Sequence, residues 1–559
     1  MQTEEAATMT DVYHSDLDKN PANYSSLSPV DFLLRSATVF PGKTAVIDQQ
    51  SYSYLQLYNR VVRMASSLSN MGVGRNDTVS VLCFNTLELL ETHYSVPMLG
   101  AVLNTLNTRQ DAASLRYILA HCESSVLIYD TEFELFVGQI IDELDKPPAL
   151  IAIARDGGPA VIQGHQRYED LVSAGDDSFV WHKVQDEWDP ISLNYTSGTT
   201  GNPKGVVYHH RGAWLSAMSN AMALNMTADS VYLWTLPMFH CNGWCYTWAV
   251  TAVGGTHVCL RKIDPEQIHQ KIVDHKVTHM CGAPVVLNMI LNDFSNRGWT
   301  IPLPTRFALG GAAPSATVVR KGQDVGFDIC HLYGLTESYG PSAVCVWQND
   351  WETLDADALA EKMSRQGTGL YAIDALVVLD RTSGEPVPAD GTTLGELALR
   401  GNTVMKGYLK NPAGTREAFA DGWFRTGDLA VMHPDNYVEI KDRAKDIIIS
   451  GGENISSKEI EDVLYRHPDV FEVAVVALAH EKWGEVPCAF ITLKNDDTER
   501  DPAEFIRYCS QHLASFKVPK KIVLGQLPKT ATGKIRKNIL RDLARETGDD
   551  GPPPGAMPQ

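Results

Sequence analysis

From about residue 28 to residue 300, amphipathic helical patterns alternate with short apolar runs rich in β-branched residues. Three such runs are TVSVLCF (78–84), SSVLIYD (124–130) and THVCL (256–260). Regular alternation of helices and short strands is typical of α/β layers in which most strands run parallel. The pattern therefore predicts an α/β fold for this part of the chain, and no internal repeat interrupts it.

Residues 370–440 are richer in strands and turns, and a different unit begins near residue 442. The strand-like runs are YAIDALVVLD, GELALRG and NYVEIKD, and the new unit starts with DRAKDIIISGGENISSKEIEDVL. There Ser456 and Glu459 fit a capping box, Ile460, Val463 and Leu464 share one helix face, and Pro468 ends the helix. Two strands (VFEVAVVAL and PCAFITLK), a helix (PAEFIRYCSQHL) and a basic end predict a small α/β domain.

These shifts in pattern predict four segments. Residues 1–25 form a loosely ordered arm, and residues 26–444 form a large domain. Residues 445–545 form a small mobile domain, and residues 546–559 form a disordered tail whose Pro and Gly content is too high for independent folding.

Charge and composition exclude several classes of protein. A net charge of -20 argues against general binding to nucleic acid or to anionic membranes. No apolar run approaches the ~20 residues of a membrane span, and the acidic N-terminus lacks the pattern of a signal peptide. Ten cysteines without CxxC pairs suit a reducing compartment. We therefore expect a soluble cytoplasmic protein without a membrane span or a nucleic-acid partner.

His240, Cys241 and Cys245 lie close together and raise the question of a metal site. Free cysteines pack well as small apolar residues, so packing beside a substrate cavity is the favoured interpretation.

The run YTSGTTGNPKG (195–205) has the composition of a loop that holds phosphates. Gly198, Gly201 and Gly205 alternate with hydroxyl side chains, and Lys204 supplies one positive charge. The common phosphate loop needs four residues between its glycines and then Lys followed by Ser or Thr. Gly198 and Gly201 are too close for that loop, so a phosphate-loop NTPase fails on spacing.

Further motifs follow in order, and each alone is weak evidence, since a Gly-rich turn is usually only a turn. They are PMFHCNGW (237–244), GGAAP (310–314), YGLTES (333–338), GWFRTGDLA (422–430), DRAKDIIISGGENIS (442–456) and PKTATGKIRK (528–537). Together they closely resemble the adenylate-forming superfamily, specifically the acyl-CoA synthetases, over residues 28–545. The HCNGW variant resembles the branch that activates short- and medium-chain acids, including methylthiopropionate-type ligases.

The resemblance implies a fold and a two-step reaction. The fold is a large N-terminal domain of two α/β sheet layers and a small β-barrel, followed by a mobile α+β C-terminal domain. A carboxylic acid first attacks ATP to give an acyl-adenylate and pyrophosphate, with Mg²⁺ and cationic groups neutralising charge. The thiol of coenzyme A then displaces AMP. Alternatives are delivery to a carrier protein, a relative limited to one half-reaction and a non-catalytic relative; a homodimer is left open.

The resemblance assigns the loop a role as a mobile clamp on the β- and γ-phosphates of ATP. Lys204 supplies charge, and hydrogen bonds come from Ser197, Thr199, Thr200 and the backbone that includes Gly198 and Gly201. Glu337 is the expected Mg²⁺ ligand, and Thr196 is a weaker second ligand. The remaining residues implied for the nucleotide are Gly311, Ala312, Ala313 and Tyr333 at adenine, Gly334 and Thr336 of the same motif, Asp428 at the ribose hydroxyls, and Arg443 at the ribose or a phosphate.

The acyl pocket is implied around His240, at its meeting point with the α-phosphate. Trp244 and Trp248 stand at i and i+4, so they can share one helix face and wall the pocket, although core packing is nearly as strong an interpretation. The motif glycines Gly310 and Gly334 are also implied as pocket residues. No acidic residue lies between Met238 and Trp248, which counts against an amino-acid substrate.

The C-terminal region is expected to supply the remaining chemistry. Residues 515–541 contain eight Lys or Arg and no Asp or Glu, which is either a solvated face or a surface for anionic substrates. The resemblance implies that Lys534 reaches the α-phosphate and carboxylate and that Lys445 is the hinge of a domain rotation. It places coenzyme A at Gly451, Gly452, Glu453, Trp483 and Phe516, while Val518 replaces a cation found in some relatives.

Overall fold

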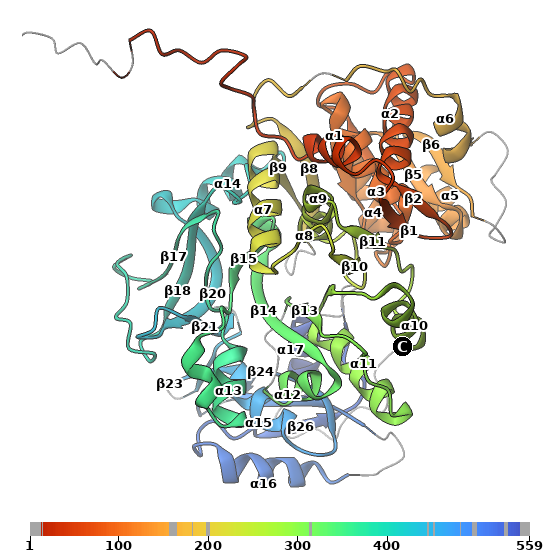
Figure 1. The fold of residues 1–559 in the computed structure, drawn as a ribbon. Coiled ribbons are helices and arrows are strands. Elements are labelled where there is room, and N and C mark those ends of the chain that lie inside the picture. The colour runs from red at the N-terminus through yellow and green to blue at the C-terminus, as the bar shows by residue number, and fades with distance from the viewer. Residues whose placement is uncertain are drawn as a thin grey trace, which may run out of the picture.

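Most of the chain folds into two large sheets, one smaller sheet and a separate C-terminal sheet (Figure 1). The computed structural model describes residues 13, 15–155, 165–181, 183–196, 202–311, 316–443, 446–450, 453–480, 482–494, 500–529 and 535–547. Residues 15–25 are exposed and form neither helix nor strand. Within the described residues, no helix has the length and apolar character needed to cross a membrane.

An eight-stranded sheet is built mainly from the first half of the chain, in the order β19-β9-β8-β4-β3-β5-β6-β7. The strands from β8 to β7 run parallel, while β9 and β19 add antiparallel strands at one edge. The strands are β3 (Thr78–Leu82), β4 (Val102–Thr105), β5 (Ser124–Asp130), β6 (Ala149–Ile153), β7 (Gln166–Arg167), β8 (Pro190–Thr196), β9 (Lys204–His209) and β19 (Gly407–Tyr408).

A nine-stranded sheet follows the order β16-β15-β14-β13-β12-β10-β11-β1-β2. Its six central strands run parallel, and the outer strands β2, β15 and β16 are antiparallel. The prediction of α/β layers with mainly parallel strands is confirmed. The strands are β1 (Thr44–Ile47), β2 (Ser51–Ser53), β10 (Val231–Leu233), β11 (Thr256–Val258), β12 (His279–Gly282), β13 (Thr305–Leu309), β14 (Phe327–Leu335), β15 (Gly340–Val344) and β16 (Thr368–Gly369).

Amphipathic helices cover these sheets. In α2 (Tyr54–Asn70), a capping box of Ser53 and Gln56 starts the helix, and Leu57, Val61 and Leu68 on one face are fully buried. The other helices of the large domain are α1 (Val30–Val39), α3 (Leu87–Ser95), α4 (Ala112–His121), α5 (Glu134–Ile141), α6 (Tyr168–Ala174), α7 (His210–Ala223), α8 (Cys241–Trp244), α9 (Tyr246–Val253), α10 (Pro265–His275), α11 (Pro284–Arg297), α12 (Ala316–Val325), α13 (Ala356–Ser364) and α14 (Pro412–Ala418).

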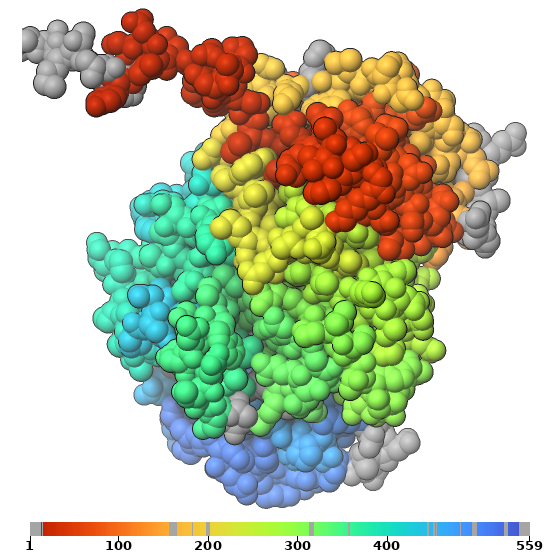
Figure 2. All heavy atoms as spheres, in the orientation of Figure 1, coloured from red at the N-terminus to blue at the C-terminus, as the bar shows by residue number. Residues whose placement is uncertain are grey.

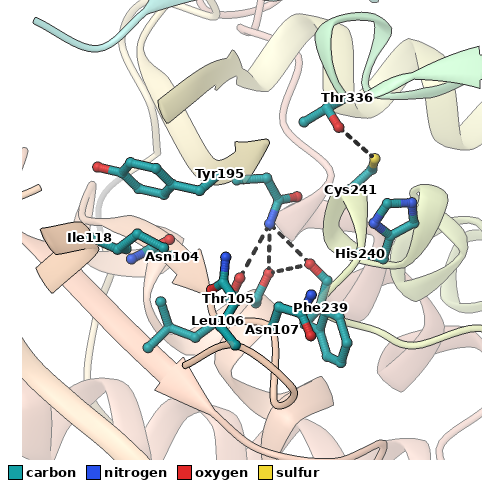
Figure 3. A pocket seen from close by; sticks show the side chains of 12 residues that line it. Asn104, Thr105, Leu106, Asn107, Ile118, Tyr195, Phe239, His240, Cys241 and Thr336 are labelled. Carbon is teal, nitrogen blue, oxygen red and sulfur yellow. Dashed lines mark hydrogen bonds between the residues drawn. The ribbon is translucent and has the colours of Figure 1, made fainter. Parts of the chain in front are cut away.

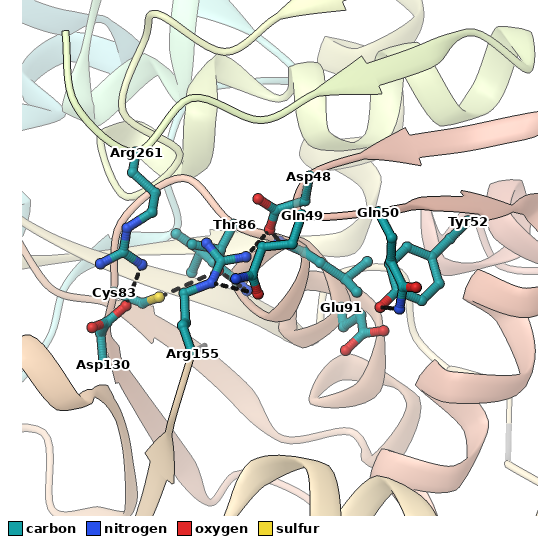
Figure 4. A network of polar contacts seen from close by, with 12 residues as sticks. Asp48, Gln49, Gln50, Tyr52, Cys83, Thr86, Glu91, Asp130, Arg155 and Arg261 are labelled. Atoms are coloured by element: carbon teal, nitrogen blue, oxygen red, sulfur yellow. Dashed lines mark hydrogen bonds and ion pairs between the residues drawn. The ribbon is translucent and has the colours of Figure 1, made fainter. Parts of the chain in front are cut away.

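Two ion pairs cross between the large sheets at the carboxyl ends of their strands (Figure 4). Arg155, after β6 of the eight-stranded sheet, pairs with Asp48, after β1 of the nine-stranded sheet. In the opposite direction, Arg261 after β11 pairs with Asp130 at the end of β5, at 2.6 Å. Each sheet thus contributes one arginine and one aspartate, and the two pairs fix how the carboxyl edges of the sheets face each other.

The predicted small β-barrel corresponds to a four-stranded antiparallel sheet in the order β17-β18-β20-β21. The runs singled out in the sequence form its strands, and GELALRG is strand β18 in full. The strands are β17 (Ile373–Leu379), β18 (Gly395–Gly401), β20 (Phe424–Met432) and β21 (Val438–Arg443).

The C-terminal sheet and its helices form one end of the molecule, drawn in blue in Figures 1 and 2. Ser456 caps α15 by accepting from the Glu459 N–H, and Ile460 and Leu464 are fully buried, as predicted. The Glu459 carboxylate does not complete a capping box but accepts from Lys517 Nζ at 2.7 Å. The elements are β22 (Ile448–Ser450), β23 (Glu453–Ile455), β24 (Val470–His480), β25 (Gly484–Leu493), β26 (Lys521–Leu524), α15 (Ser457–Tyr465), α16 (Pro502–His512) and α17 (Lys537–Thr547).

Candidate active site

The two ends of the predicted phosphate loop are held by a β-hairpin. Thr196 at the end of β8 pairs directly with Lys204 at the start of β9, so the loop leaves and re-enters one edge of the sheet. The exposed Lys204 ammonium lies 4.7 Å from the centre of the Tyr408 ring. The pairing fixes the base of the loop, whose tip residues 197–201 lie outside the described residues.

Glu337 lies beside this hairpin, in a 3-10 turn between β14 and β15. The Tyr408 hydroxyl donates to Glu337 Oε1 at 2.9 Å, so one aromatic ring contacts both the predicted phosphate cation and the predicted metal ligand. Burial, followed by the neighbouring Glu337 charge, raises the pKa of Tyr408, which therefore stays a protonated donor. Within the described part of the chain, the second Glu337 oxygen makes no hydrogen bond, and the carboxylate interacts electrostatically with Arg443.

The predicted ribose residues form a connected group. Asp428 and Arg443 are directly opposite each other in β20 and β21, and Arg443 Nε lies 2.5 Å from Asp428 Oδ1. The Tyr333 hydroxyl donates to the other oxygen, Asp428 Oδ2, at 2.6 Å. Burial opposes the charge on Arg443, but the acidic groups around it, Asp428 foremost, together outweigh burial, and the pKa of Arg443 is raised. The Asp428 carboxylate thus accepts from both Arg443 and Tyr333.

His240 lines a polar pocket in which the two large sheets meet (Figure 3). The pocket combines residues of the β4 end, the β8 end and the segment before α8, together with Thr336. Its lining includes Thr105, Asn194, Phe239 and Cys241. The half-buried His240 is therefore next to the strand that carries Thr196, which agrees with a site in which an acid and a phosphate meet.

The neighbouring cysteines are packed residues. Cys241 and Cys245 are buried, and their thiols donate to Thr336 Oγ1 and to the Tyr339 carbonyl at 3.7 and 3.6 Å. Among the described residues, the group that lies close enough to share a metal is His467, Asp469 and Glu504, far along the chain in the C-terminal region. Arg500 pairs with both carboxylates of that group.

The expected helix face shared by Trp244 and Trp248 is wrong. All five residues from Cys241 to Cys245 have positive φ, between 42° and 63°, so the backbone makes a left-handed turn before α9 begins. Left-handed backbone costs about 1–2 kcal/mol for each non-glycine residue, and four of the five residues of this turn are not glycine. The i and i+4 spacing consequently does not place the two rings together.

The two tryptophans have different surroundings. A Cβ on Gly310 would lie 2.6 Å from Trp244 Cη2, so the Trp244 ring packs directly over that glycine. Trp248 is fully buried, with its ring 5.8 Å from Tyr339 and 6.0 Å from His93. Both tryptophans belong to the same buried core, and Trp244 is the one that packs against the predicted pocket glycine.

Two motif glycines have a backbone reason for being glycine. A Cβ on Gly334 would lie only 1.9 Å from the Gly340 carbonyl oxygen, because β14 and β15 approach closely at this bulge. Gly311, after β13, has φ of 87°, which L side chains rarely adopt. Both positions thus shape the backbone around Glu337 and Trp244 whether or not they touch a ligand.

The predicted coenzyme A residues that are described lie on the C-terminal surface. Glu453 is exposed, and the Trp483 and Phe516 rings are 44% and 41% exposed with a lysine ammonium near each face. In the basic stretch, ion pairs with carboxylates involve Lys517, Lys529, Lys537 and Arg541. Half of the eight cations in this stretch are therefore paired with carboxylates of the protein, so the basic stretch partly stabilises the fold.

Several predicted residues lie outside the described part of the chain, and their roles stay predictions. They are Ser197, Gly198, Thr199, Thr200, Gly201, Ala312, Ala313, Lys445, Gly451, Gly452 and Lys534.

Three residues around the site lie outside the motifs found in the sequence. Tyr408 comes from a two-residue edge strand, and Thr105 and Asn194 come from distant strands to meet Asn242 of the PMFHCNGW motif. Polar residues inside otherwise apolar strand runs, such as Asn194 in PISLNYT, are the feature that could have marked Thr105 and Asn194.

Two family models match the chain. The model described as AMP-binding enzyme matches residues 33–409, and the one described as AMP-binding enzyme C-terminal domain matches residues 459–534. The chain belongs to the AMP-binding enzyme family. Within it, the chain is an AMP-forming acyl-CoA ligase, which activates a carboxylic acid with ATP and transfers the acyl group to coenzyme A.

Similar proteins of known activity cover nearly the whole chain. An acetate/butyrate–CoA ligase of Arabidopsis thaliana, described as peroxisomal, is 46% identical over 95% of this chain and 97% of its own. An acetate–CoA ligase of Humulus lupulus is 47% identical with the same coverage. A 2-methylpropanoate–CoA ligase of Humulus lupulus is 46% identical over 95% of this chain and 98% of its own.

Solved structures show the same fold. The o-succinylbenzoate coenzyme A synthetase of Bacillus subtilis with ATP and a magnesium ion has a TM-score of 0.78 at 26% identity, covering 91% of this chain and 99% of its own. An anthranilate CoA ligase in complex with anthranoyl-AMP has a TM-score of 0.82 at 24% identity, covering 94% and 99%, and this match concerns the fold alone.

Proposed function

We propose that this ligase acts on short-chain aliphatic monocarboxylic acids. The observation that carries the proposal is the Trp244 ring packed over Gly310, a contact that would close the end of an acyl pocket bounded by these two residues. No carboxylate lies between Met238 and Trp248 to pair with an ammonium group. The names of the similar ligases, with acetate, butyrate and 2-methylpropanoate as acids, agree with this size class.

We assign the phosphate and metal roles to the group around Tyr408. Lys204 neutralises the β- and γ-phosphates of ATP, and the Tyr408 hydroxyl orients the Glu337 carboxylate. The free Glu337 oxygen has the hard donor chemistry that Mg²⁺ prefers, and Thr196 at the hairpin base is the second candidate ligand. The ion supplies positive charge that stabilises the pyrophosphate leaving group.

We assign binding of the nucleoside part of ATP to the group around Asp428. Its carboxylate accepts from the ribose hydroxyls, while Arg443 and Tyr333 hold it in place. The same hydrogen bond fixes the Tyr333 ring, which is then preorganised to stack on adenine beside Gly311.

In this proposal, the second half-reaction requires the C-terminal domain to rotate relative to the large domain. We assign Lys534 to the adenylation arrangement and Lys445 to the hinge, with the boundary at residues 444–445. Coenzyme A enters along Gly451 and Gly452, and its nucleotide meets Glu453, Trp483 and Phe516, where exposed rings and lysines lie together.

The proposed location is the cytoplasm, although the Arabidopsis relative is peroxisomal. A fluorescent fusion of the full chain tests it, and co-localisation with a peroxisomal marker contradicts it.

Trp244→Ala tests the substrate assignment. We expect the preferred acid to become longer or bulkier, because each methylene accommodated in an apolar pocket contributes about 1–3 kcal/mol. The measurement is kcat/KM over straight and branched acids of increasing length, followed by pyrophosphate release and thiol consumption. Trp248→Phe is the matched control and leaves the profile unchanged. An unchanged profile for Trp244→Ala with only reduced stability contradicts Trp244 as the pocket wall.

A further inference from the structure

The left-handed turn Cys241–Cys245 directly follows His240 and contains Trp244, the two predicted acyl-site residues. Its φ angles of 42°, 42°, 63°, 52° and 62° are maintained only if surrounding contacts over-determine them. Because His240 precedes the turn and Trp244 lies within it, whatever holds the turn also sets where both side chains point.

Asn194 holds the turn from the opposite sheet. Its Nδ2 donates to the Phe239 carbonyl at 3.0 Å, and its Oδ1 accepts from the Asn242 N–H at 2.7 Å. These two bonds bracket His240 on both sides. Asn194 is only 4% exposed, so water cannot replace it cheaply.

Thr105, at the end of β4, completes the contact. Its hydroxyl donates to the same Phe239 carbonyl at 2.9 Å and accepts from Nδ2 of both Asn194 and Asn242, at 3.0 and 2.9 Å. Figure 3 shows the bond between the Thr105 hydroxyl and the Phe239 carbonyl, below His240. Thr105 is 4% exposed and Asn242 is fully buried, so these hydrogen bonds are shielded from water.

A third asparagine secures the preceding segment. Asn85 Nδ2 donates to the carbonyls of Trp234 and Leu236 at 2.8 and 3.0 Å, and Asn85 Oδ1 accepts from the Met238 N–H at 2.7 Å. Thus side chains of the eight-stranded sheet and its loops hold the segment 234–242, which belongs to the other sheet.

We propose that Thr105 and Asn194 are positioning residues that present His240 and Trp244 to the acid. The proposal rests on the proposed function, which places His240 and Trp244 at the acyl pocket. Asn194 is two residues from Thr196 on the same strand, so the clamp also ties the acyl turn to the base of the phosphate loop. The clamp thereby fixes the position of the acid relative to ATP, and acid selectivity depends on a buried hydroxyl whose hydrogen bonds go to Phe239, Asn194 and Asn242.

Thr105→Val tests the clamp, because it removes the hydroxyl and keeps the volume. The matched control is Thr305→Val: Thr305 is fully buried, and its hydroxyl also donates to a backbone carbonyl, that of Val277, at 2.9 Å. Thr305 starts β13, at the opposite end of the strand from Gly310. Both variants lose a buried hydroxyl that donates to a backbone carbonyl, and Thr105→Val also removes the acceptor for Asn194 and Asn242, which is the contact under test.

We expect Thr105→Val to raise KM for the acid about tenfold or more, to leave KM for ATP within about twofold, and to flatten the chain-length profile. Thr305→Val lowers thermal stability comparably without changing the profile. Thr105→Ser keeps the hydroxyl and restores the parental profile, and it also serves if Thr105→Val does not fold. The positioning role is contradicted if Thr105→Val and Thr305→Val have the same chain-length profile. It is also contradicted if the profile of Thr105→Ser is as flat as that of Thr105→Val. If the unsubstituted enzyme forms thioester with no aliphatic acid, the proposed function itself fails.

Discussion

At the scale of single residues, the site depends on short chains of contact rather than on isolated catalytic groups. Lys204, Tyr408 and Glu337 illustrate this, because the Tyr408 ring lies beside Lys204, the proposed phosphate cation, and its hydroxyl donates to Glu337, the proposed metal ligand. Asp428 likewise works through Tyr333 and Arg443. Replacing a residue in such a chain therefore changes its neighbour as well.

Lys204→Ala is expected to slow pyrophosphate formation by roughly a hundred- to a thousand-fold, the scale for one preorganised charge or donor. The rate of pyrophosphate release in a single turnover measures this loss. Tyr408→Phe is the companion variant: it keeps the ring under Lys204 but removes the bond to Glu337, so we expect a raised Mg²⁺ requirement with a smaller loss of rate. A Lys204→Ala enzyme within a few-fold of the parent removes this lysine from the mechanism.

At the scale of elements, helix α15 connects local capping to the contact between domains. Ser456 Oγ accepts from the Glu459 N–H at 3.2 Å and donates to the Lys441 carbonyl at 2.7 Å, on the other side of the predicted hinge. The Asp442 carboxylate also accepts from the Ser457 N–H at 2.6 Å. A single helix start therefore serves both as a cap and as an interdomain contact.

Ser456→Ala is expected to destabilise α15 by about 1 kcal/mol, the usual loss for an N-cap, and to remove the bond to Lys441. Hydrogen exchange of the full chain measures both effects. We expect the backbone amides of α15 to exchange faster in Ser456→Ala. Ser53→Ala, which removes the cap of α2, is the control and leaves α15 protection unchanged. Unchanged α15 exchange in Ser456→Ala contradicts the prediction.

At the scale of the whole molecule, the two half-reactions demand two positions of the C-terminal domain. The bonds from Ser456 and Ser457 to residues 441 and 442 span the proposed hinge, so rotation at Lys445 must break them. The arrangement described is thus one of at least two that the proposed mechanism requires.

Lys534→Ala is expected to abolish adenylate formation but to retain thioester formation from supplied acyl-adenylate and coenzyme A. Lys445→Pro is expected to do the reverse, because proline restricts φ to about -65° and hinders rotation. Each half-reaction is assayed separately, by pyrophosphate release and by thiol consumption. Loss of the same half-reaction in both variants contradicts domain alternation.

Stability is expected to fall in mild acid because several histidines are buried in neutral form. Burial lowers the pKa of His93, His209 and His331 to about 4 and that of His210 and His257 to about 3. The unfolded chain protonates these side chains near pH 6.5, whereas the folded chain does not. Their contribution is complete above pH 6.5 and is lost as pH falls toward 4, by about 1.4 kcal/mol per pH unit for each group.

Thermal unfolding measured between pH 7.5 and pH 5 checks this dependence. His331→Gln keeps a donor for the Arg365 carbonyl and is expected to flatten the fall of Tm with acid. His512→Gln, at an exposed helix end, is the control and leaves the slope unchanged. A Tm independent of pH over this range contradicts the prediction.

The sequence by itself determined what depends on neighbouring residues: the strands at 78–82, 124–130 and 395–401, the Ser456 cap, and the ordered motifs that define the family. Hydrophobic period and capping are local effects, so a short window contains them. Only the tertiary structure decided that Trp244 and Trp248 separate, that Tyr408 joins Lys204 to Glu337, and that Thr105 and Asn194 hold the acyl turn. The spacing argument assumed right-handed helix, and contacts from the other sheet, more than 40 residues away along the chain, hold a left-handed turn instead.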